Sequence, residues 1–380
     1  MELPLSDDQV AFQKTARDFA HKELAPHADG WDAREEFPRA ALSALAALGF
    51  AGIYVQPEHG GSGLRRQDAA LIFEALAEGC PSTAAFLSIH NMASWMVDEF
   101  GDAALRARLV PPLCRMDMIA SYCLTEPDAG SDAASLRTRA ELQGEHYIVN
   151  GSKSFISGGG VSDLYVTMLR TGGEGAGGIS CLAIARDTPG LRFGKPEQKL
   201  GWRNQPTAQV IFEDCRVPRT QLLGREGEGF KIAMRGLDGG RINIAACSLG
   251  AAAQALAQAR AYAAERTQFG KPLGALQAIQ FKLADMATEL WAARLMVWHA
   301  ARALDEGAAA HSAQIAMAKR FATDAGFRIV NEALQIHGGY GYLREYGLER
   351  LLRDVRVHQI LEGTNEIMRV IIARALAAPE

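Results

Sequence analysis

One carboxylate near the end of the chain, Glu362, has surroundings that suit a proton acceptor. It follows the apolar pair Ile360-Leu361 and precedes Gly363. Removal from water raises the pKa of a carboxylic acid toward neutrality, where the group can serve as a general base. The same residues also fit an ordinary glutamate exposed at a helix end, so this stretch alone leaves both roles open.

The elements that would position Glu362 are two helices joined by a tight turn. Residues 351–361 carry apolar side chains at helical spacing, and a second such run begins at Ile367. Gly363 can adopt the left-handed conformation that ends the first helix, and Thr364 or Asn365 can cap the second. The glutamate would then be held on the corner between the two helices.

A second candidate site is the turn at residues 122–132, which follows a strand-like apolar run. Thr125 and Ser131 contribute hydroxyl groups, and Gly130 leaves backbone N–H groups accessible. Such groups can meet a phosphate or the polar edge of a ring system. An ordinary turn after a strand has the same composition, so the residue types do not decide between the two.

Two further stretches could bind an anion. Residues 335–341 form a glycine-rich turn after a predicted helix. Because this turn does not follow a strand and lacks Gly-x-Gly-x-x-Gly spacing, it is not the dinucleotide fingerprint of a βαβ unit. Arg266, at the end of another predicted helix, could pair with a phosphate through two N–H groups. A simple interhelical turn and a solvated charge are the alternative interpretations.

The composition argues against several classes of protein. The formal net charge of the 380 residues is -4 and there is no basic run, which argues against nucleic acid as a partner. The six cysteines and nine histidines lack metal-binding spacing, which predicts buried thiols, a reducing compartment and no metal site. No apolar run approaches the ~20 residues needed to span a bilayer. The acidic N-terminus resembles no leader peptide, so we expect the cytoplasm, or the mitochondrial matrix for a trimmed precursor.

The segment pattern predicts an α+β protein in three parts. Residues 1–117 favour helices, and Ser6 with Gln9 forms a capping box before the first of them. Residues 118–226 favour a small antiparallel β domain. Residues 227–380 favour a helical bundle, with helices expected at 230–265, 276–304, 313–337 and 347–361.

Within the β part, the dipeptide Asn150-Gly151 lies between two strand-like runs. This arrangement is the strongest short signal for a hairpin, because both residues tolerate the turn that joins two antiparallel strands. Short runs rich in β-branched residues predict further strands at 164–169, 180–185 and 209–212.

Over essentially its whole length the chain resembles the acyl-CoA dehydrogenase family. One family signature is Cys123-Leu-Thr-Glu-x-x-Ala-Gly-Ser-Asp-x-x-Ser135, and the other runs from Gln335-x-x-Gly-Gly-x-Gly-Tyr342 through Glu345 and Arg350 to Asp354. The resemblance implies an N-terminal helical domain, a middle antiparallel β-barrel-like domain and a C-terminal four-helix bundle. It also implies FAD as the cofactor, an acyl-CoA as the substrate, and a homotetramer built as a dimer of dimers.

Carried over residue by residue, the resemblance places the catalytic base at Glu362 and substrate contacts at Ser131, Asp238, Arg241 and Gly363. One set of residues would line the flavin, with the Ser157 hydroxyl near N5: Tyr122, Leu124, Thr125, Gly130, Ser131, Phe155, Ile156 and Ser157. Thr364 and Glu366 would contact FAD beside the base. Five residues would bind the FAD of a neighbouring subunit: Arg266, Gln268, Phe269, Gln335 and Gly339. Leu276, Gln277 and Gly338 would also bind the cofactor. Many members have Trp-Ile-Thr where this chain has Phe155-Ile156-Ser157, which leaves the ring packing open.

The resemblance also implies a reaction and a substrate. Glu362 would take the α-proton of the thioester, the flavin would take the β-hydride, and an electron-transferring flavoprotein would receive the electrons. Some members carry their base just before the position of Arg241, where this chain has Gly240, so the base must come from Glu362. Four long stretches are most similar to members that convert isobutyryl-CoA to methacrylyl-CoA in valine breakdown: 57–64, 88–92, 236–245 and 357–363. Butyryl-CoA or 2-methylbutyryl-CoA, and a flavoprotein that binds acyl-CoA without turnover, are the alternatives.

Overall fold

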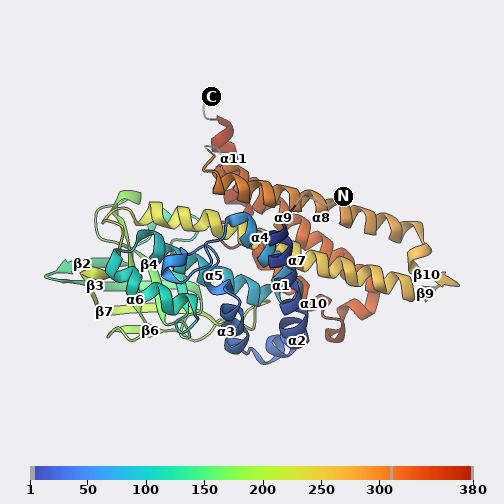
Figure 1. The fold of residues 1–380 in the computed structure, drawn as a ribbon, viewed down its shortest axis with the longest axis horizontal. Coiled ribbons are helices and arrows are strands. Elements are labelled where there is room, and N and C mark those ends of the chain that lie inside the picture. Colours follow the sequence, from blue (N-terminus) through green and yellow to red (C-terminus); the bar gives the residue numbers. More distant parts are fainter. Residues whose placement is uncertain (1–4, 309–310, 378–380) are drawn as a thin grey trace.

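The computed structural model describes residues 5–308 and 311–377. Helices form the first part of the chain (Figure 1). The predicted capping box is confirmed, because the backbone N–H groups of Ser6 and Gln9 each donate to the other's side chain at 3.2 Å. The helices of this part are α1 Asp7–Phe19, α2 Ala25–Arg34, α3 Arg39–Ala47, α4 Arg66–Gly79, α5 Pro81–Phe100 and α6 Ala103–Cys114.

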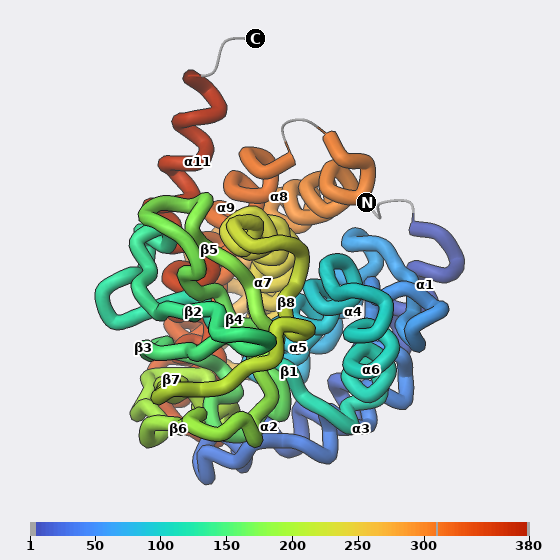
Figure 2. The backbone as a smooth tube through the Cα atoms, turned by 90° about the vertical axis from the view of Figure 1, so that its left-hand side faces the viewer, coloured from blue at the N-terminus to red at the C-terminus, as the bar shows by residue number. Residues whose placement is uncertain are grey.

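The middle of the chain forms a sheet with strand order β6-β7-β3-β2-β4-β5-β8. Most neighbours are antiparallel, but β1 pairs with β4 in parallel. Figure 2 shows the strands from their end of the molecule, with α4 and α6 to one side. The strands are β1 Ala120–Cys123, β2 Arg139–Gln143, β3 His146–Ser157, β4 Leu164–Arg170, β5 Ile179–Ala185, β6 Leu191–Phe193, β7 Thr207–Pro218 and β8 Leu222–Leu223.

The predicted hairpin at Asn150-Gly151 is wrong, because both residues lie inside the continuous strand β3. The dipeptide forms an irregularity in the pairing with β7, where Gly151 has φ +139° and the Asn150 side chain both donates to and accepts from Asp214 at 2.9 Å. A β-carbon on Gly151 would lie 2.7 Å from Thr138. The turn that joins β2 to β3 lies instead at Gly144, which has φ +60°.

The last part of the chain is helical again and is centred on α7. This helix starts against β5 and runs to the small β9–β10 hairpin at the other end of the molecule (Figure 1), packing on α4, α5, α8 and α9. The fourth predicted helix ends early, at Arg356, because a 3₁₀ turn follows it. The elements are α7 Gly229–Glu265, β9 Thr267–Gln268, β10 Lys271–Pro272, α8 Gln277–Asp305, α9 His311–His337, α10 Leu348–Arg356 and α11 Asn365–Ala377.

The helix α7 is long and apolar enough to cross a membrane by length and composition alone, contrary to the expectation from the sequence. However, 78% of its most apolar 18-residue window is buried inside the fold. Burial among other helices is what the central helix of a packed core requires, so its hydropathy is explained by the bundle.

Candidate active site

Glu362 lies on the turn between α10 and α11 in the left-handed conformation, with φ +54°, and Gly363 follows with φ +94°. The Thr364 hydroxyl caps α11 by accepting from the backbone N–H of Ile367 at 3.3 Å. The predicted corner is therefore present. A glutamate with positive φ is uncommon, and it persists only where neighbouring groups hold it.

Two buried cations hold this turn through successive carbonyl groups. Arg241 on α7 donates from Nε to the carbonyl oxygen of Glu362 at 3.0 Å. Lys319 on α9 donates from Nζ to the carbonyl oxygen of Gly363 at 2.9 Å and to Oδ1 of Asn365 at 3.0 Å. Both basic side chains are buried. They fix the backbone of the glutamate and leave its carboxylate free.

The carboxylate of Glu362 has the electrostatic surroundings of a base. Its Oε2 atom is buried and has no hydrogen-bond partner in the described chain. Burial raises the pKa of Glu362 to about 7, although the charges of Arg241 and Lys319 act in the opposite direction. The alternative of an exposed glutamate therefore fails for this atom. At neutral pH a substantial fraction of the side chain is ionised and can accept a proton.

Asp238 orients Arg241 from one turn earlier on α7. Its Oδ1 accepts from Nη1 of Arg241 at 2.8 Å, and its Oδ2 accepts from the hydroxyl of Ser312 at 2.8 Å. The structure thus brings together three residues predicted separately, namely Asp238, Arg241 and Glu362.

The end of β1 and the wall formed by β3 lie side by side, as the flavin prediction requires. The backbone N–H of Ser154 donates to the carbonyl of Thr125 at 2.8 Å, which joins the two segments. The hydroxyl of Tyr122 is buried without a partner in the described chain, and the charge of Glu362 contributes to raising the pKa of Tyr122, after burial itself. Phe155 has φ +58° and is 68% exposed.

The other predicted flavin and substrate residues differ in exposure and position. Leu124 and Ile156 are buried, whereas Ser131 is exposed, and a β-carbon on Gly130 would meet no atom within 4 Å. Ser157 accepts a hydrogen bond at its carbonyl from Ser121 at 2.5 Å. Glu366 is exposed at the start of α11, and its neighbour Thr364 is half-buried.

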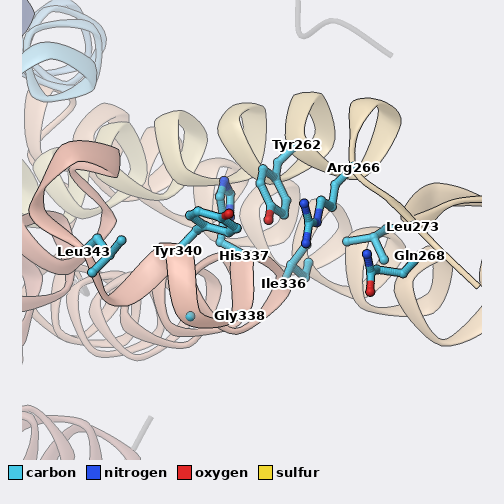
Figure 3. A pocket seen from close by; sticks show the side chains of 10 residues that line it. Tyr262, Arg266, Gln268, Leu273, Ile336, His337, Gly338, Tyr340 and Leu343 are labelled. Atoms are coloured by element: carbon cyan, nitrogen blue, oxygen red, sulfur yellow. The ribbon is translucent and has the colours of Figure 1, made fainter.

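The remaining predicted cofactor residues form a separate group at the far end of α7. A pocket of about 380 Å³ opens there between α7 and the turn after α9 (Figure 3). The guanidinium of Arg266 lies 5.4 Å from the centroid of the Tyr340 ring. Predicted residues in the lining are Arg266, Gln268, Gly338 and Gly339. Phe269, Leu276, Gln277 and Gln335 do not line it, and Phe269 is 91% exposed.

The two groups are too far apart to be neighbours within one chain. Arg241 and Arg266 lie 25 residues apart on or just after the same helix, and a rise of 1.5 Å per residue places them about 37 Å apart along its axis. The structure does not bring the Arg266 group to Glu362.

The chemistry of both groups fits a flavin dinucleotide. The Tyr122 hydroxyl, on whose pKa the charge of Glu362 acts, is buried without a partner in the described chain, and the turn after β1 exposes Ser131. At the far pocket, β-carbons on Gly338 and Gly339 would meet nothing within 4 Å, and Arg266 has no ion-pair partner among the described residues. A free guanidinium beside open glycine backbone suits a phosphate.

Lys319 was missed by the sequence analysis, although a signal for it exists. Within α9 it shares a helix face with Ile315, Ala322 and Gly326, all of which are buried. A lysine on an otherwise apolar stripe marks a buried charge that needs partners. The partners themselves, on the turn at Gly363, could not be read from that stripe.

Models of three domains of the acyl-CoA dehydrogenase family match the chain. The N-terminal domain model matches residues 6–117, the middle domain model 121–215 and the C-terminal domain model 227–377. The chain is 57% identical over 374 residues to the mitochondrial isobutyryl-CoA dehydrogenase of Bos taurus, covering 98% of this chain and 90% of that protein.

Solved structures agree with these matches over full chain lengths. The butyryl-CoA dehydrogenase of Megasphaera elsdenii superimposes with a TM-score of 0.96 at 40% identity, covering 100% of both chains. A chain in a structure described as the electron transferring flavoprotein of Acidaminococcus fermentans superimposes with a TM-score of 0.97 at 42% identity, again covering 100% of both. The predicted fold and the FAD cofactor are confirmed, and the chain belongs to the acyl-CoA dehydrogenase family.

Proposed function

We propose that this protein oxidises a short branched acyl-CoA, converting isobutyryl-CoA to methacrylyl-CoA with Glu362 as the base. The observation that carries the proposal is the buried, unpaired Oε2 atom of Glu362, together with the pKa of this residue, which burial raises to about 7. The identity of 57% to an isobutyryl-CoA dehydrogenase supports the choice of substrate. Because a relative of known structure acts on butyryl-CoA, the straight-chain thioester is the main alternative.

The turn at Glu362 offers two groups to the thioester. The carboxylate removes the α-proton, and the backbone N–H of the same residue has no acceptor in the described chain. A donor aimed at the thioester oxygen would stabilise the negative charge that develops there as the proton leaves. Arg241 and Lys319 keep the turn in place without neutralising either group. Bound FAD supplies the acceptor for the β-hydride.

The two separate groups of cofactor residues support a proposal about assembly. Tyr122, Thr125 and Ser157 would meet the flavin of their own subunit, and Arg266 with Gly339 would bind the FAD of a neighbour. The exposed Phe269 would be covered in that contact. We therefore propose a homotetramer built as a dimer of dimers, each subunit with domains at 1–117, 118–226 and 227–380. The similarity to a chain from an electron transferring flavoprotein structure supports such a flavoprotein as the electron acceptor.

An anaerobic titration tests the proposal. The purified protein is mixed with isobutyryl-CoA or n-butyryl-CoA while flavin absorbance is followed. We expect rapid bleaching that favours isobutyryl-CoA, and a loss of at least about 10²-fold in Glu362→Gln with FAD retained. The variant Glu306→Gln, at an exposed glutamate at the end of α8, is the control.

Each contrary outcome removes a different part of the proposal. Faster bleaching with n-butyryl-CoA would replace the substrate and keep the base. Near-normal bleaching in Glu362→Gln would remove the base. Bound FAD that neither thioester bleaches would favour a flavoprotein that binds acyl-CoA without turnover.

A further inference from the structure

Arg66, at the start of α4, is a buried cation whose guanidinium has no ion-pair partner among the described residues. Only 8% of its surface is exposed, and its Nη1 atom is buried with no acceptor in the described chain. The guanidinium lies instead between two rings, 3.7 Å from the centroid of Tyr54 and 4.8 Å from that of Trp95. Cation–π contacts on both sides can stabilise a desolvated guanidinium and also hold it in place.

The guanidinium and the base rest against adjacent positions of the same helix. A β-carbon on Gly239 would lie 2.3 Å from Nη1 of Arg66, and one on Gly240 would lie 2.4 Å from Oε2 of Glu362. Neither glycine carries a side chain, so α7 leaves both polar groups in contact with its backbone. Arg66 and Glu362 therefore flank the same short stretch of α7.

Tyr54 connects the two groups. The guanidinium of Arg66 lies over the Tyr54 ring, and the Tyr54 hydroxyl accepts a hydrogen bond from Nδ2 of Asn243 at 3.3 Å. Burial raises the pKa of Tyr54, and the charges of Arg66 and Glu362 act on the same hydroxyl in opposite directions. The Oδ1 atom of Asn243 is buried without a partner in the described chain, as is Nη1 of Arg66.

We propose that Arg66 closes the acyl end of the substrate site and thereby selects short acyl chains. This inference rests on the proposed function, because the α-carbon of the substrate must reach Glu362. An acyl group that extends from there along Gly239 meets the guanidinium fixed between Tyr54 and Trp95. A longer chain would collide with this side chain.

The test is chain-length preference in Arg66→Ala. The FAD-loaded protein is assayed with isobutyryl-, n-butyryl-, hexanoyl- and octanoyl-CoA. A pocket distinguishes substrates by about 10- to 200-fold per methylene. We therefore expect the ratio of kcat/KM for hexanoyl-CoA over isobutyryl-CoA to rise at least about 10-fold in the variant. The matched control is Arg65→Ala, which removes the same charge from the exposed neighbouring residue and should leave the ratio unchanged.

Two more variants separate bulk from charge and guard against misfolding. Arg66→Met keeps a long side chain without the charge, and it should retain most of the short-chain preference. Arg66→Gln is a milder truncation, to be used if Arg66→Ala loses FAD or its cooperative unfolding, and it should shift the ratio in the same direction by less.

The outcomes distinguish this inference from the proposed function. An active, folded truncation at Arg66 with an unchanged hexanoyl-to-isobutyryl ratio would overturn the role of Arg66. An equal shift in Arg66→Met and Arg66→Ala would overturn it too, because bulk would then not be the selecting property. If the wild-type protein oxidises none of the four thioesters, the proposed function fails instead.

Discussion

Lys319 lies buried beneath the turn that carries Glu362, and each of these two charges favours the ionised form of the other. The lysine Nζ donates to the carbonyl oxygen of Gly363, one residue after the base, at 2.9 Å. Burial outweighs the mutual attraction, since it lowers the pKa of Lys319 to about 8 and raises that of Glu362 to about 7. The lysine therefore keeps the base more acidic than burial alone would make it.

Replacing Lys319 by methionine should move the pH dependence of flavin reduction. Loss of the positive charge raises the pKa of Glu362 further, so the rise in rate should shift to higher pH and the rate at pH 7 should fall about 10-fold or more. Anaerobic stopped-flow measurements between pH 6 and 9 would show the shift. Lys231→Met, at an exposed lysine on α7, is the control. An unchanged profile in Lys319→Met would mean that the lysine does not act on the base.

The unusual pKa of Glu362 should also appear in the stability of the protein. Its pKa is about 7 when folded and near the ordinary value of 4.5 when unfolded, so the folded state binds more protons between these values. The contribution of Glu362 to the free energy of unfolding is therefore fully present below about pH 4.5, and it is lost as the pH rises through about 7. A difference of about 2.5 units corresponds to at most about 3 kcal/mol.

Glu362→Gln removes this pH-dependent cost. Relative to the wild type, the variant should become more stable as the pH rises from 5 to 8, by up to about 3 kcal/mol. Urea unfolding of both proteins at each pH measures the difference. A constant difference at the two pH values would show that Glu362 has an ordinary pKa in the folded protein.

If Glu362 is the base, a side chain at position 240 should lower the rate of flavin reduction. The variant Gly240→Ala places a β-carbon 2.4 Å from the present position of Oε2, so the carboxylate must move. A displaced base should cost about 10²-fold in flavin reduction. The fold and FAD should be retained, because alanine favours a helix over glycine by about 1 kcal/mol. Gly173→Ala, where a β-carbon would meet nothing within 4 Å, is the control. Full activity in Gly240→Ala would place the reacting carboxylate elsewhere.

The sequence predicted those parts of the site that are determined by residues close together in the chain. The left-handed Gly363 and the cap at Thr364 follow from residues within a few positions of the base, whereas the raised pKa of Glu362 depends on burial against Gly240 of α7, which the local residues left open. The cations could not be predicted in this way. Arg66 and Lys319 owe their roles to contacts made by segments far away in the chain.

The failed hairpin has a related cause. Asn150-Gly151 suits a turn and also suits a bulge, because both need a glycine with positive φ. The bulge forms because β3 pairs with β7, and this pairing brings Asn150 into contact with Asp214. That partner strand lies about 60 residues further along, beyond the reach of any local pattern.

The pair Lys153 and Glu126 should control how firmly the segments beside the flavin are held. Lys153 is fully buried and donates from Nζ to Glu126 at 2.7 Å and to the carbonyl of Leu124 at 3.0 Å. The Glu126 carboxylate also accepts from the backbone N–H groups of Arg137 and Thr138 at 2.6 and 2.9 Å. The pair thus ties the turn after β1 to β3 through buried, charge-assisted hydrogen bonds.

Lys153→Met should destabilise the protein by about 3–5 kcal/mol, because it leaves the carboxylate of Glu126 buried without its cation. It should also weaken FAD retention, since Leu124 loses its hydrogen bond from Lys153 and the backbone bond between Thr125 and Ser154 alone then joins this turn to β3. Thermal unfolding and the flavin-to-protein absorbance ratio after gel filtration measure the two effects, with Lys195→Met at an exposed lysine as the control. The double variant Lys153→Met/Glu126→Gln should lose less stability than the sum of the single changes. Strict additivity would show that the two side chains act independently, and the turn would then owe its position to the backbone bonds alone.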